Sequence, residues 1–531
     1  MSKMPSVMAH DFSRVPRAEI PRSSFDRSHG LKTAFNSGEL IPVFVDEALP
    51  GDTFNLNMTG FARLATPLHP FMDNVFLNTF FFAVPYRLIW TNFQKFMGEQ
   101  DNPDDSTDYL IPQIVSPVGG YAQNTIFDYM GIPTLVPGLS HSALPLRAYN
   151  LIYNQWFRDQ NLQDSVPVPV GDSDDPTAYF LRRRGKRHDY FTSSLPWPQK
   201  GPGVDIPLGT SAPIMGIGTN TQVFPVAGAT VVETGGGAAT YPFSVAGSDA
   251  ANTINFKGTS AAGGVPEIYA DLTQASAATI NQLRQAFQIQ KLYERDARGG
   301  TRYTEIIRAH FNVVSPDARL QRPEYLGGGQ STVNLYPIPQ SSGTGGYTAT
   351  PQGSLAAYGT SNMHGHGFTK SFTEHCVIIG LCSVRADLNY QQGLNKMWSR
   401  RTKFDFYWPA LSHIGEQTVL NKEIYAQGSA DPAADEAAWG YQERFAEYRY
   451  KPSIITGEMR SNATQPLDTW HLAQNFSALP QLDAAFIEDK PPLERVLAVL
   501  DEPQFIFDAY FKLRCARPMP MYGVPGLIDH F

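Results

Sequence analysis

The chain has 531 residues and a formal net charge of −8, from 42 Lys and Arg residues against 50 Asp and Glu residues. This balance excludes a protein coated in basic surface, so any nucleic acid must be bound locally. Glycine (44) and proline (41) are frequent and charged residues make up only 17% of the chain, a composition that favours β-structure with long ordered loops.

The amino-terminal region lacks the apolar segment of a signal peptide, and no stretch approaches the roughly 18 apolar residues of a membrane span. We therefore expect neither secretion nor membrane insertion. Residues 1–39 carry more basic than acidic side chains and form a candidate nucleic-acid-binding arm. The side chains expected to make these contacts are Arg14, Arg17, Arg22, Arg27 and Lys32.

The first long apolar segment, residues 76–84, predicts a strand that lies between two layers. Pro85 ends this strand and can open a helix with one apolar stripe. That stripe consists of Ile89, Phe93, Phe96 and Met97. A second helix is expected after Ser142, with Pro145 in its first turn. Its buried face would consist of Ala148, Leu151, Ile152 and Trp156.

Residues 182–187 form a dense basic run, and two aromatic residues, Tyr190 and Phe191, follow it in the sequence. Guanidinium groups pair with phosphates and aromatic rings stack on unpaired bases, so this pattern is typical of a site for single-stranded nucleic acid. The alternative is a solvated loop or an ion-pair site between subunits, with partners from the acidic turn at residues 172–175. Both interpretations remain open. The basic run consists of Arg182, Arg183, Arg184, Lys186 and Arg187.

The acidic turn contains Asp172, Asp174 and Asp175. It lacks the glycine and the distal glutamate of a twelve-residue calcium loop, which favours a solvated turn over a calcium site. Residues 201–265 are rich in Gly, Ala and Thr and almost uncharged. Strand-like pieces at residues 222–226 and 230–233 predict a small β excursion there.

A helix is expected from residue 276 to residue 298, with Ile280, Leu283 and Phe287 facing inward and Gly299 as the stop signal. Residues 315–329 contain two prolines and three consecutive glycines, which predict an extended connector. His364 and His366 have no third ligand at zinc-site spacing, so a glycine-rich loop is the preferred interpretation.

Cys376 and Cys382 would lie about 20 Å apart on one strand, which excludes a disulfide between them. Together with Cys515 they are predicted to be buried thiols. His375 precedes Cys376, but neighbours on a strand point to opposite faces, which argues against a catalytic pair.

A second basic stretch, residues 396–403, is interleaved with aromatic residues. Aromatic residues at this density are more typical of subunit contacts than of base-stacking platforms, so a subunit interface is the preferred interpretation. Residues 505–515 alternate between apolar and polar, which predicts a strand with one buried face. Residues 518–531 are a candidate tether. The predicted interface residues are Trp398, Phe404, Phe406, Tyr407, Tyr522 and Phe531.

Several long segments, in the same order along the chain, resemble one protein family. They are RSSFDRSHGLKTAF (22–35), LIPVFVDEALPGDTF (40–54), KRHDYFTS (186–193), SPDARLQRPEYLGGG (315–329), LNKMWSRRTKFDFYWPALSHIGEQTVLNKEIY (394–425), WGYQERFAEYRYKPSIITGEMRS (439–461) and MPMYGVPGLIDHF (519–531). The chain resembles the major capsid proteins of the Microviridae, specifically those of the gokushovirus branch. The resemblance covers nearly the whole chain except the stretch from residue 201 to about residue 264.

This resemblance implies a mainly β fold, an eight-stranded antiparallel viral jelly roll with long helix-containing loop insertions. It also implies pentamers and a T=1 icosahedral shell around circular single-stranded DNA, in a virion assembled in the cytoplasm of a bacterial host. The chain would divide into an interior arm (1–39), a first part of the jelly roll (40–200), a protrusion at the three-fold axes (201–265) and the remainder with its carboxy-terminal tether (266–531).

Expected partners are copies of the chain itself, the single-stranded DNA genome, and minor phage proteins such as pilot and internal scaffolding or DNA-packaging proteins. A host cell surface is a further candidate. Two other classes of function remain as alternatives. A β-rich carbohydrate-active enzyme would need carboxylates that converge in a cleft, such as Glu488 or Asp489 with a partner. A glycan- or single-strand-binding module would form a discrete complex instead of a particle. We expect no catalytic residue, metal or cofactor, since no phosphate loop, zincin helix or serine elbow occurs.

Overall fold

The computed structural model describes residues 21–102, 104–204, 280–300, 303–312, 321–342 and 352–522, together with four short strand pieces between residues 214 and 270. The chain forms two units, which are described separately. The first contains residues 1–198 and 313–531, and the second contains residues 199–312.

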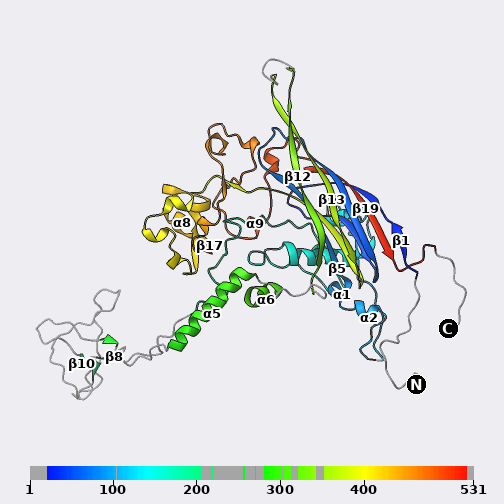
Figure 1. The fold of residues 1–531 in the computed structure, drawn as a ribbon, viewed down its shortest axis with the longest axis horizontal. Coiled ribbons are helices and arrows are strands. Elements are labelled where there is room, and N and C mark those ends of the chain that lie inside the picture. The colour runs from blue at the N-terminus through cyan, green and yellow to red at the C-terminus, as the bar shows by residue number, and fades with distance from the viewer. Residues whose placement is uncertain are drawn as a thin grey trace, which may run out of the picture. The chain divides into compact units, whose positions relative to one another are not determined.

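The first unit is built around one antiparallel sheet, with the strand order β1-β19-β4-β13-β12-β5-β14-β3 and β2 also paired with β19 (Figure 1). Its strands are β1 (Ser23–Asp26), β2 (His29–Phe35), β3 (Ile41–Ala48), β4 (Thr53–Leu64), β5 (Val75–Pro85), β12 (Glu324–Pro339), β13 (Leu355–Ser371), β14 (Cys376–Ala386) and β19 (Phe505–Arg517). The predicted mainly β fold is confirmed, and the curled antiparallel sheet fits a jelly roll with insertions.

Strands β1 and β2 lie end to end along the same edge of β19. Asp26 pairs with Arg514 and His29 pairs with Phe511, and between them the Arg27 N–H donates to the Leu513 carbonyl at 2.9 Å. The two pieces thus act as one interrupted strand, which gives the sheet eight strand positions. Residues 23–35, expected in an arm, are therefore sheet edge, because their backbone pairs with that of β19.

Strand β12 connects the two halves of the sheet. Its first part, up to Val333, pairs with β5, and its last six residues pair with β13. The predicted connector at residues 315–329 is therefore wrong for residues 324–329, which lie inside β12, and its residues 315–320 lie outside the described residues. A Cβ at Gly328 would stand 2.0 Å from the Thr79 carbonyl oxygen, and one at Gly329 would stand 2.4 Å from the His366 ring. The glycines are required because neighbouring strands approach closely here.

The concave side of the sheet encloses the main hydrophobic core. Strand β19 alternates strictly between buried and exposed residues from Phe505 to Cys515, as predicted, and each of the six inward-facing residues is at most 2% exposed. Strands β5 and β14 are buried on both faces. Phe81 and Ile378 point into the main core, whereas Phe82 and Ile379 belong to a second apolar cluster. The prediction of a two-sided strand at residues 76–84 is therefore confirmed.

Short helices make the other wall of the second cluster: α1 (Tyr86–Ile89), α2 (Phe93–Phe96), α3 (Ile126–Tyr129) and α4 (Leu144–Ile152). Pro145 stands in the first turn of α4, as predicted. The single helix expected after Pro85 is two helices broken at Trp90, and Met97 is 51% exposed instead of buried. Trp156 is 39% exposed, because the chain forms a π-helical turn after Ile152 and the indole donates to the Pro323 carbonyl.

A third apolar cluster forms a lobe of small elements around Tyr190, Phe191, Val419 and Trp439 (Figure 1). Its elements are β15 (Asn389–Tyr390) paired with β18 (Ser453–Ile454), β16 (Glu416–Leu420) paired with β17 (Ala438–Glu443), α7 (Asn421–Ile424), α8 (Pro432–Glu436) and α9 (Ala484–Ile487). A further short pair, β6 (Gln113–Val115) and β7 (Ser140–Ser142), lies before α4.

The described residues of the second unit form two short antiparallel pairs and two helices. The pairs are β8 (Ile214–Met215) with β11 (Tyr269–Ala270) and β9 (Ile217–Gly218) with β10 (Asn255–Phe256), and the helices are α5 (Ile280–Gly299) and α6 (Tyr303–Phe311). The predicted pieces at residues 222–226 and 230–233 lie outside the described residues. The helix is confirmed, but Phe287, expected to face inward, is 61% exposed.

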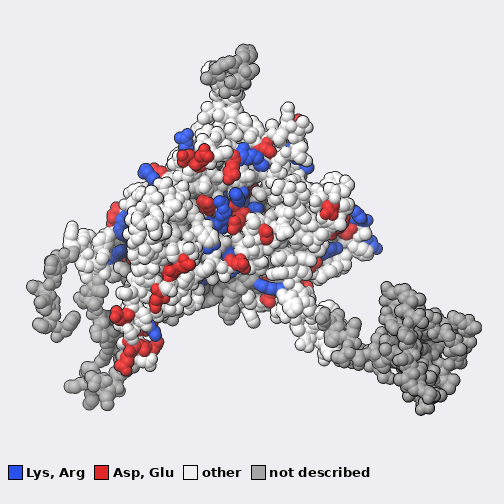
Figure 2. Space-filling view, turned by 180° about the vertical axis from the view of Figure 1, so that it is seen from behind, with Lys and Arg blue, Asp and Glu red and all other residues white. Residues whose placement is uncertain are grey.

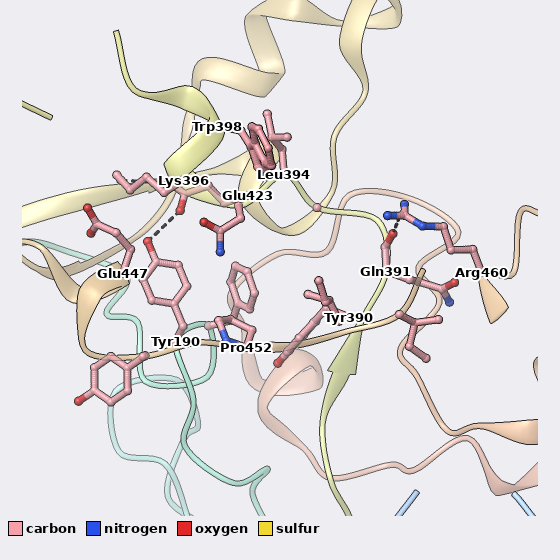
Figure 3. A pocket seen from close by; sticks show the side chains of 16 residues that line it. Tyr190, Tyr390, Gln391, Leu394, Lys396, Trp398, Glu423, Glu447, Pro452 and Arg460 are labelled. Atoms are coloured by element: carbon pink, nitrogen blue, oxygen red, sulfur yellow. Dashed lines mark hydrogen bonds and ion pairs between the residues drawn. The ribbon is translucent and has the colours of Figure 1, made fainter. Parts of the chain in front are cut away.

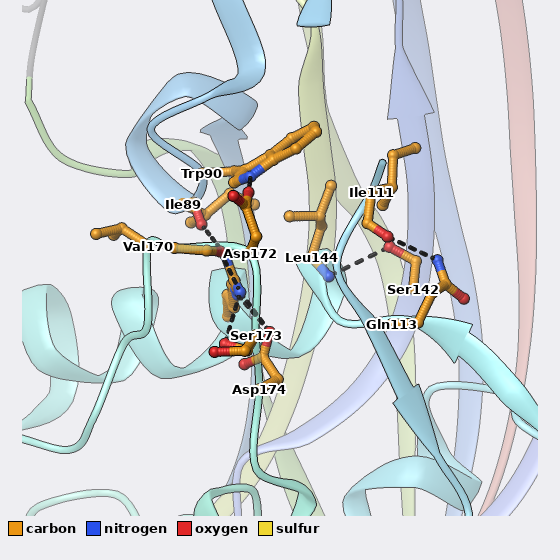
Figure 4. A network of polar contacts seen from close by, with 12 residues as sticks. Ile89, Trp90, Ile111, Gln113, Ser142, Leu144, Val170, Asp172, Ser173 and Asp174 are labelled. Atoms are coloured by element: carbon orange, nitrogen blue, oxygen red, sulfur yellow. Dashed lines mark hydrogen bonds and ion pairs between the residues drawn. The ribbon is translucent and has the colours of Figure 1, made fainter. Parts of the chain in front are cut away.

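A buried ion pair fixes the loop that holds the three aspartates (Figure 4). The side chains of Arg147 and Asp174 are both fully buried, and the guanidinium also donates to the carbonyls of Ile89 and Gly171, each at 2.8 Å. Asp174 accepts a further bond from the Tyr179 hydroxyl, and Asp172 accepts one from the Trp90 indole at 2.6 Å. The predicted solvated turn is therefore wrong for Asp174.

Replacing Arg147 by methionine is expected to lower the free energy of unfolding by about 3–5 kcal/mol, because a buried carboxylate loses its cationic partner and three carbonyls lose a donor. Denaturant unfolding of the unassembled protein measures this. Lys95→Met is the matched control, since Lys95 and Asp101 form an exposed pair at 3.9 Å whose loss costs at most about 1 kcal/mol. Equal effects of the two substitutions would contradict the role assigned to Arg147.

Candidate nucleic-acid and subunit interfaces

The basic run at residues 182–187 forms the middle of a three-stranded backbone clamp. On one side the Leu40 N–H donates to the Arg182 carbonyl at 2.9 Å and the Arg184 N–H donates to the Gly38 carbonyl at 2.8 Å. On the other side the Lys186 N–H donates to the Ile487 carbonyl, and the Asp489 N–H donates to the Arg184 carbonyl, each at 2.7 Å. The run is therefore neither a helix nor a free loop, and it connects two distant parts of the chain.

The side chains of the three arginines are engaged within the fold. The Arg182 guanidinium lies 3.4 Å from the centroid of the Phe180 ring. Arg183 pairs with Glu39 at 3.2 Å and donates to the Ser37 carbonyl. Arg184 donates to the Asn78 side chain at 3.2 Å, and burial lowers the pKa of its guanidinium to about 10.

Lys186 is buried beside Asp489. Its ammonium lies 4.4 Å from the centroid of the Phe486 ring, and burial lowers its pKa. The Asp489 carboxyl is 3% exposed, and burial raises its pKa to about 7 although Lys186, Arg184 and Arg385 act in the opposite direction. These cations and this carboxyl form an internal polar cluster, so most of the run contributes to the fold.

Arg187 is the member of the run that reaches solvent. Its side chain is 63% exposed, with Asp387 at 3.7 Å. Tyr190 and Phe191 are each 4% exposed and belong to the third apolar cluster, so they offer no ring for stacking on a base. On the face drawn in Figure 2, basic and acidic side chains are interspersed without a continuous basic surface.

The predicted amino-terminal contacts divide into three kinds. Arg14 and Arg17 lie outside the described residues. Arg27 is held by both carboxylate oxygens of Asp46, at 2.6 and 2.9 Å. Arg22 donates to the Thr53 hydroxyl at 2.6 Å, and Lys32, with 80% of its side chain exposed, lies 3.3 Å from Asp508. Only Arg22 and Lys32 of this set remain exposed among the residues that the structure describes.

A row of large aromatic side chains stands in solvent on the loop that follows β15. Trp398 is 70% exposed, and Phe404, Phe406, Tyr407 and Trp408 are each 50–55% exposed. We call these five residues the aromatic surface. The sequence pattern singled out the first four; Trp408 was missed, although it directly follows Tyr407.

Short 3-10 turns hold this loop in place. The Asp405 carboxylate accepts from the N–H groups of Arg401 and Thr402, at 2.9 and 2.7 Å, which lowers the Asp405 pKa. Arg400 stacks on Phe406 and Tyr448, with ring centroids at 5.2 and 4.5 Å, and lies 3.6 Å from Glu447. The backbone is thus fixed while each of the five side chains stays half or more exposed, an arrangement that suits a preformed contact with another molecule.

Tyr522, predicted as a tether contact, is 78% exposed, and Phe531 lies outside the described residues. These two residues therefore stay predictions.

A cavity of about 190 Å³ lies beside Trp398 (Figure 3). Glu423 at its wall accepts hydrogen bonds from the Tyr190 hydroxyl at 2.8 Å and from Lys396 at 3.1 Å. Glu447 accepts from the Gln417 amide at 2.7 Å. Both carboxylates are thus held by donors of the fold, and their arrangement is that of a structural network.

The remaining candidate sites are accounted for by packing. The predicted glycine-rich loop is wrong, because His364 and His366 both lie within β13. His366 is 6% exposed and hydrogen-bonds Thr79 at 2.8 Å, and burial lowers its pKa. Cys376, Cys382 and Cys515 are buried free thiols, as predicted. Within the described ranges no group of three His, Cys, Asp or Glu side chains is arranged to hold a metal ion. None of the described helices has the length and apolar character to cross a bilayer.

Comparison with known proteins gives matches over nearly the whole chain. Residues 13–527 match the family model described as capsid protein (F protein). The chain is 50% identical over 537 residues to the capsid protein VP1 of Bdellovibrio phage phiMH2K, covering 98% of each chain. It is 46% and 37% identical to the capsid proteins VP1 of Chlamydia phage 1 and Spiroplasma virus 4, covering 99% of both chains in each case.

Proposed function

Because this chain belongs to the phage capsid protein (F protein) family, we propose that it assembles through pentamers into a T=1 icosahedral shell that encloses a circular single-stranded DNA genome. It is a major capsid protein, a structural component of the virion and not an enzyme. Its work is self-association, in which apolar surface of one copy is covered by another.

The aromatic surface is the observation that carries the proposed mode of assembly. Five aromatic residues within eleven positions are half or more exposed on a loop whose backbone is already ordered. Exposed aromatic clusters of this kind mark protein interfaces, because Trp and Tyr bury much area at small entropic cost. Sedimentation of the purified chain tests the proposal: pentamers and larger particles are expected.

The proposed genome contact does not include the buried residues of the basic run. Arg187 and Lys32 have exposed cationic side chains, whereas Arg184 and Lys186 are held in the polar cluster around Asp489. A capsid interior needs such cations locally, since the chain as a whole carries a charge of −8.

Replacing Arg187 by alanine is expected to weaken binding of single-stranded DNA and to reduce the slope of log affinity against log salt by about 0.7, with pentamers intact. Fluorescence anisotropy with a labelled oligonucleotide at several salt concentrations measures both quantities. Lys186→Met is the paired variant, and its main effect should be a lower unfolding temperature. A drop in DNA affinity for Lys186→Met with unchanged stability would contradict this division of roles.

Further parts of the proposal concern partners and place. The glycine-rich insertion at residues 201–265 would project at the three-fold axes, where three copies cover one another's poorly charged surface. Minor phage proteins, such as pilot, internal scaffolding or DNA-packaging proteins, would bind the shell, and assembly would take place in the cytoplasm of the bacterial host. A host cell surface is the proposed external partner.

A further inference from the structure

One half of the sheet presents an outer face to solvent, formed by β2, β19, β4 and β13. Every second residue of β19 and of β4 points outward and is exposed, while the residues between them are buried in the main core. We call this the outer sheet face. Its members on β19 and β4 are Ile506, Asp508, Tyr510, Lys512, Arg514, Asn55, Asn57, Thr59, Phe61 and Arg63.

Two aromatic rings stand on this face without cover. Phe61 is 44% exposed and Tyr510 is 52% exposed. They lie on adjacent strands, two positions out of register, since Tyr510 pairs with Thr59 and Phe61 pairs with Asp508. Diagonal neighbours of this kind have side chains about 7 Å apart.

The strand partners on the far sides of the rings are small. Tyr510 faces Gly30 on β2, which has no side chain, and Phe61 faces Asn362 on β13. Among the described residues no ring contact or cation–π contact involves either aromatic side chain. The two rings are therefore platforms whose faces are free to stack.

The charge on this face is mainly positive. Lys32, Arg63, Lys512 and Arg514 are exposed there, and the acidic residues are Asp508 and Asp26. Asp508 already pairs with Lys32, and Asp26 accepts hydrogen bonds from Ser28 at 2.6 and 3.0 Å, which lower its pKa. In the part of the chain that the structure describes, no ion pair engages the side chains of Arg63, Lys512 or Arg514.

We infer that the outer sheet face binds single-stranded DNA, with bases stacked on Phe61 and Tyr510 and phosphates paired with Arg63, Lys512 and Arg514. Basic side chains around aromatic platforms on a sheet are the arrangement that binds unpaired nucleotides without sequence preference. A neighbouring subunit would have to place acidic groups opposite each of the three cations, whereas a polyphosphate chain supplies a negative charge at every nucleotide. The inference rests on the proposed function, because it takes the enclosed genome as the ligand.

The test measures binding of a fluorescein-labelled oligothymidylate to the full-length chain before assembly. Phe61→Ala and Tyr510→Ala are each expected to weaken binding about tenfold, the typical loss of one stacked base, while Tyr510→Phe keeps the ring and the affinity. Lys512→Ala and Arg514→Ala should each lower the salt slope by about 0.7. An abasic oligonucleotide of the same length should bind wild type and Tyr510→Ala equally.

Tyr336→Ala is the matched control, because Tyr336 on β12 is 44% exposed and pairs with Tyr358 on β13. The paired residues there, 334–339 and 355–360, carry no charge. This control should bind like wild type. Unchanged DNA affinity in Phe61→Ala and Tyr510→Ala would overturn the site. Loss of pentamers in these variants with DNA binding intact would also overturn it, because the outer sheet face would then be a subunit joint. If the wild-type chain binds no oligonucleotide at any salt concentration, the proposed genome contact fails and this site fails with it.

Discussion

Replacing Gly38 by alanine is expected to destabilise the protein by more than about 4 kcal/mol, an effect at the extreme of single substitutions. The backbone at Gly38 has φ +77°, and a Cβ there would stand 1.9 Å from the Asp489 carbonyl oxygen and 3.3 Å from the Arg183 guanidinium. The new methyl group can be accommodated only by opening the clamp that holds residues 182–186 between residues 38–40 and 487–489. Loss of soluble folded protein, or a strongly lowered denaturation midpoint, is the expected readout.

Gly138→Ala separates backbone strain from the steric clash. Gly138 has φ +67°, but nothing lies within 4 Å of an added Cβ, so only the left-handed conformation is penalised, at about 1–2 kcal/mol. If Gly38→Ala were no more destabilising than Gly138→Ala, the close packing of the clamp against Asp489 would be wrong.

Replacing both Trp398 and Phe404 by alanine is expected to abolish particle formation while the subunit stays folded. Each ring is more than half exposed, so its removal costs the isolated subunit little. Buried interface aromatics typically contribute about 2 kcal/mol or more each, and in a closed shell the loss recurs at every equivalent joint. Sedimentation velocity over a range of protein concentrations, with circular dichroism to verify folding, measures the effect.

Leu110→Ala is the matched control for the aromatic surface, since Leu110 is 84% exposed and lies outside it. Particles should form at the wild-type concentration with this substitution. Assembly of the Trp398 and Phe404 variant at that same concentration would show that the aromatic surface is not a subunit contact.

The predictions that succeeded concern local patterns. The alternation from Phe505 to Cys515 reflects a strand with one buried face, and the continuous apolar run at residues 76–84 reflects a strand with two. Both patterns can be recognised within a few consecutive residues. The family resemblance, carried by long segments in order, was confirmed by matches over nearly the whole chain.

The failures concern contacts between distant residues. The basic run is dense and polar in sequence, yet its partners Glu39, Asn78 and Asp489 lie more than 100 residues away, so no local pattern indicates that the run is buried. The three glycines at Gly327–Gly329 have the composition of a loop, but close approach of β5 and β13 requires glycine within a strand. Tertiary context decided both cases.

The structure divides the predicted contact residues into exposed ones, which can meet a partner, and buried ones, which cannot. The exposure of a side chain is a property that one sequence does not display. Arg187 and Lys186 are neighbours of the same charge, but the Arg187 side chain is exposed and Lys186 is buried. Phe61 and Tyr510 are more than 400 residues apart and meet only through the pairing of β4 with β19. Such constellations become visible once the strand register is known.

Electron cryo-microscopy of the purified full-length chain tests the central claim of self-assembly most directly. Closed icosahedral particles are predicted, with the aromatic surface covered by a neighbouring copy. A folded monomer at every concentration, with Trp398 and Phe404 still in solvent, would contradict it.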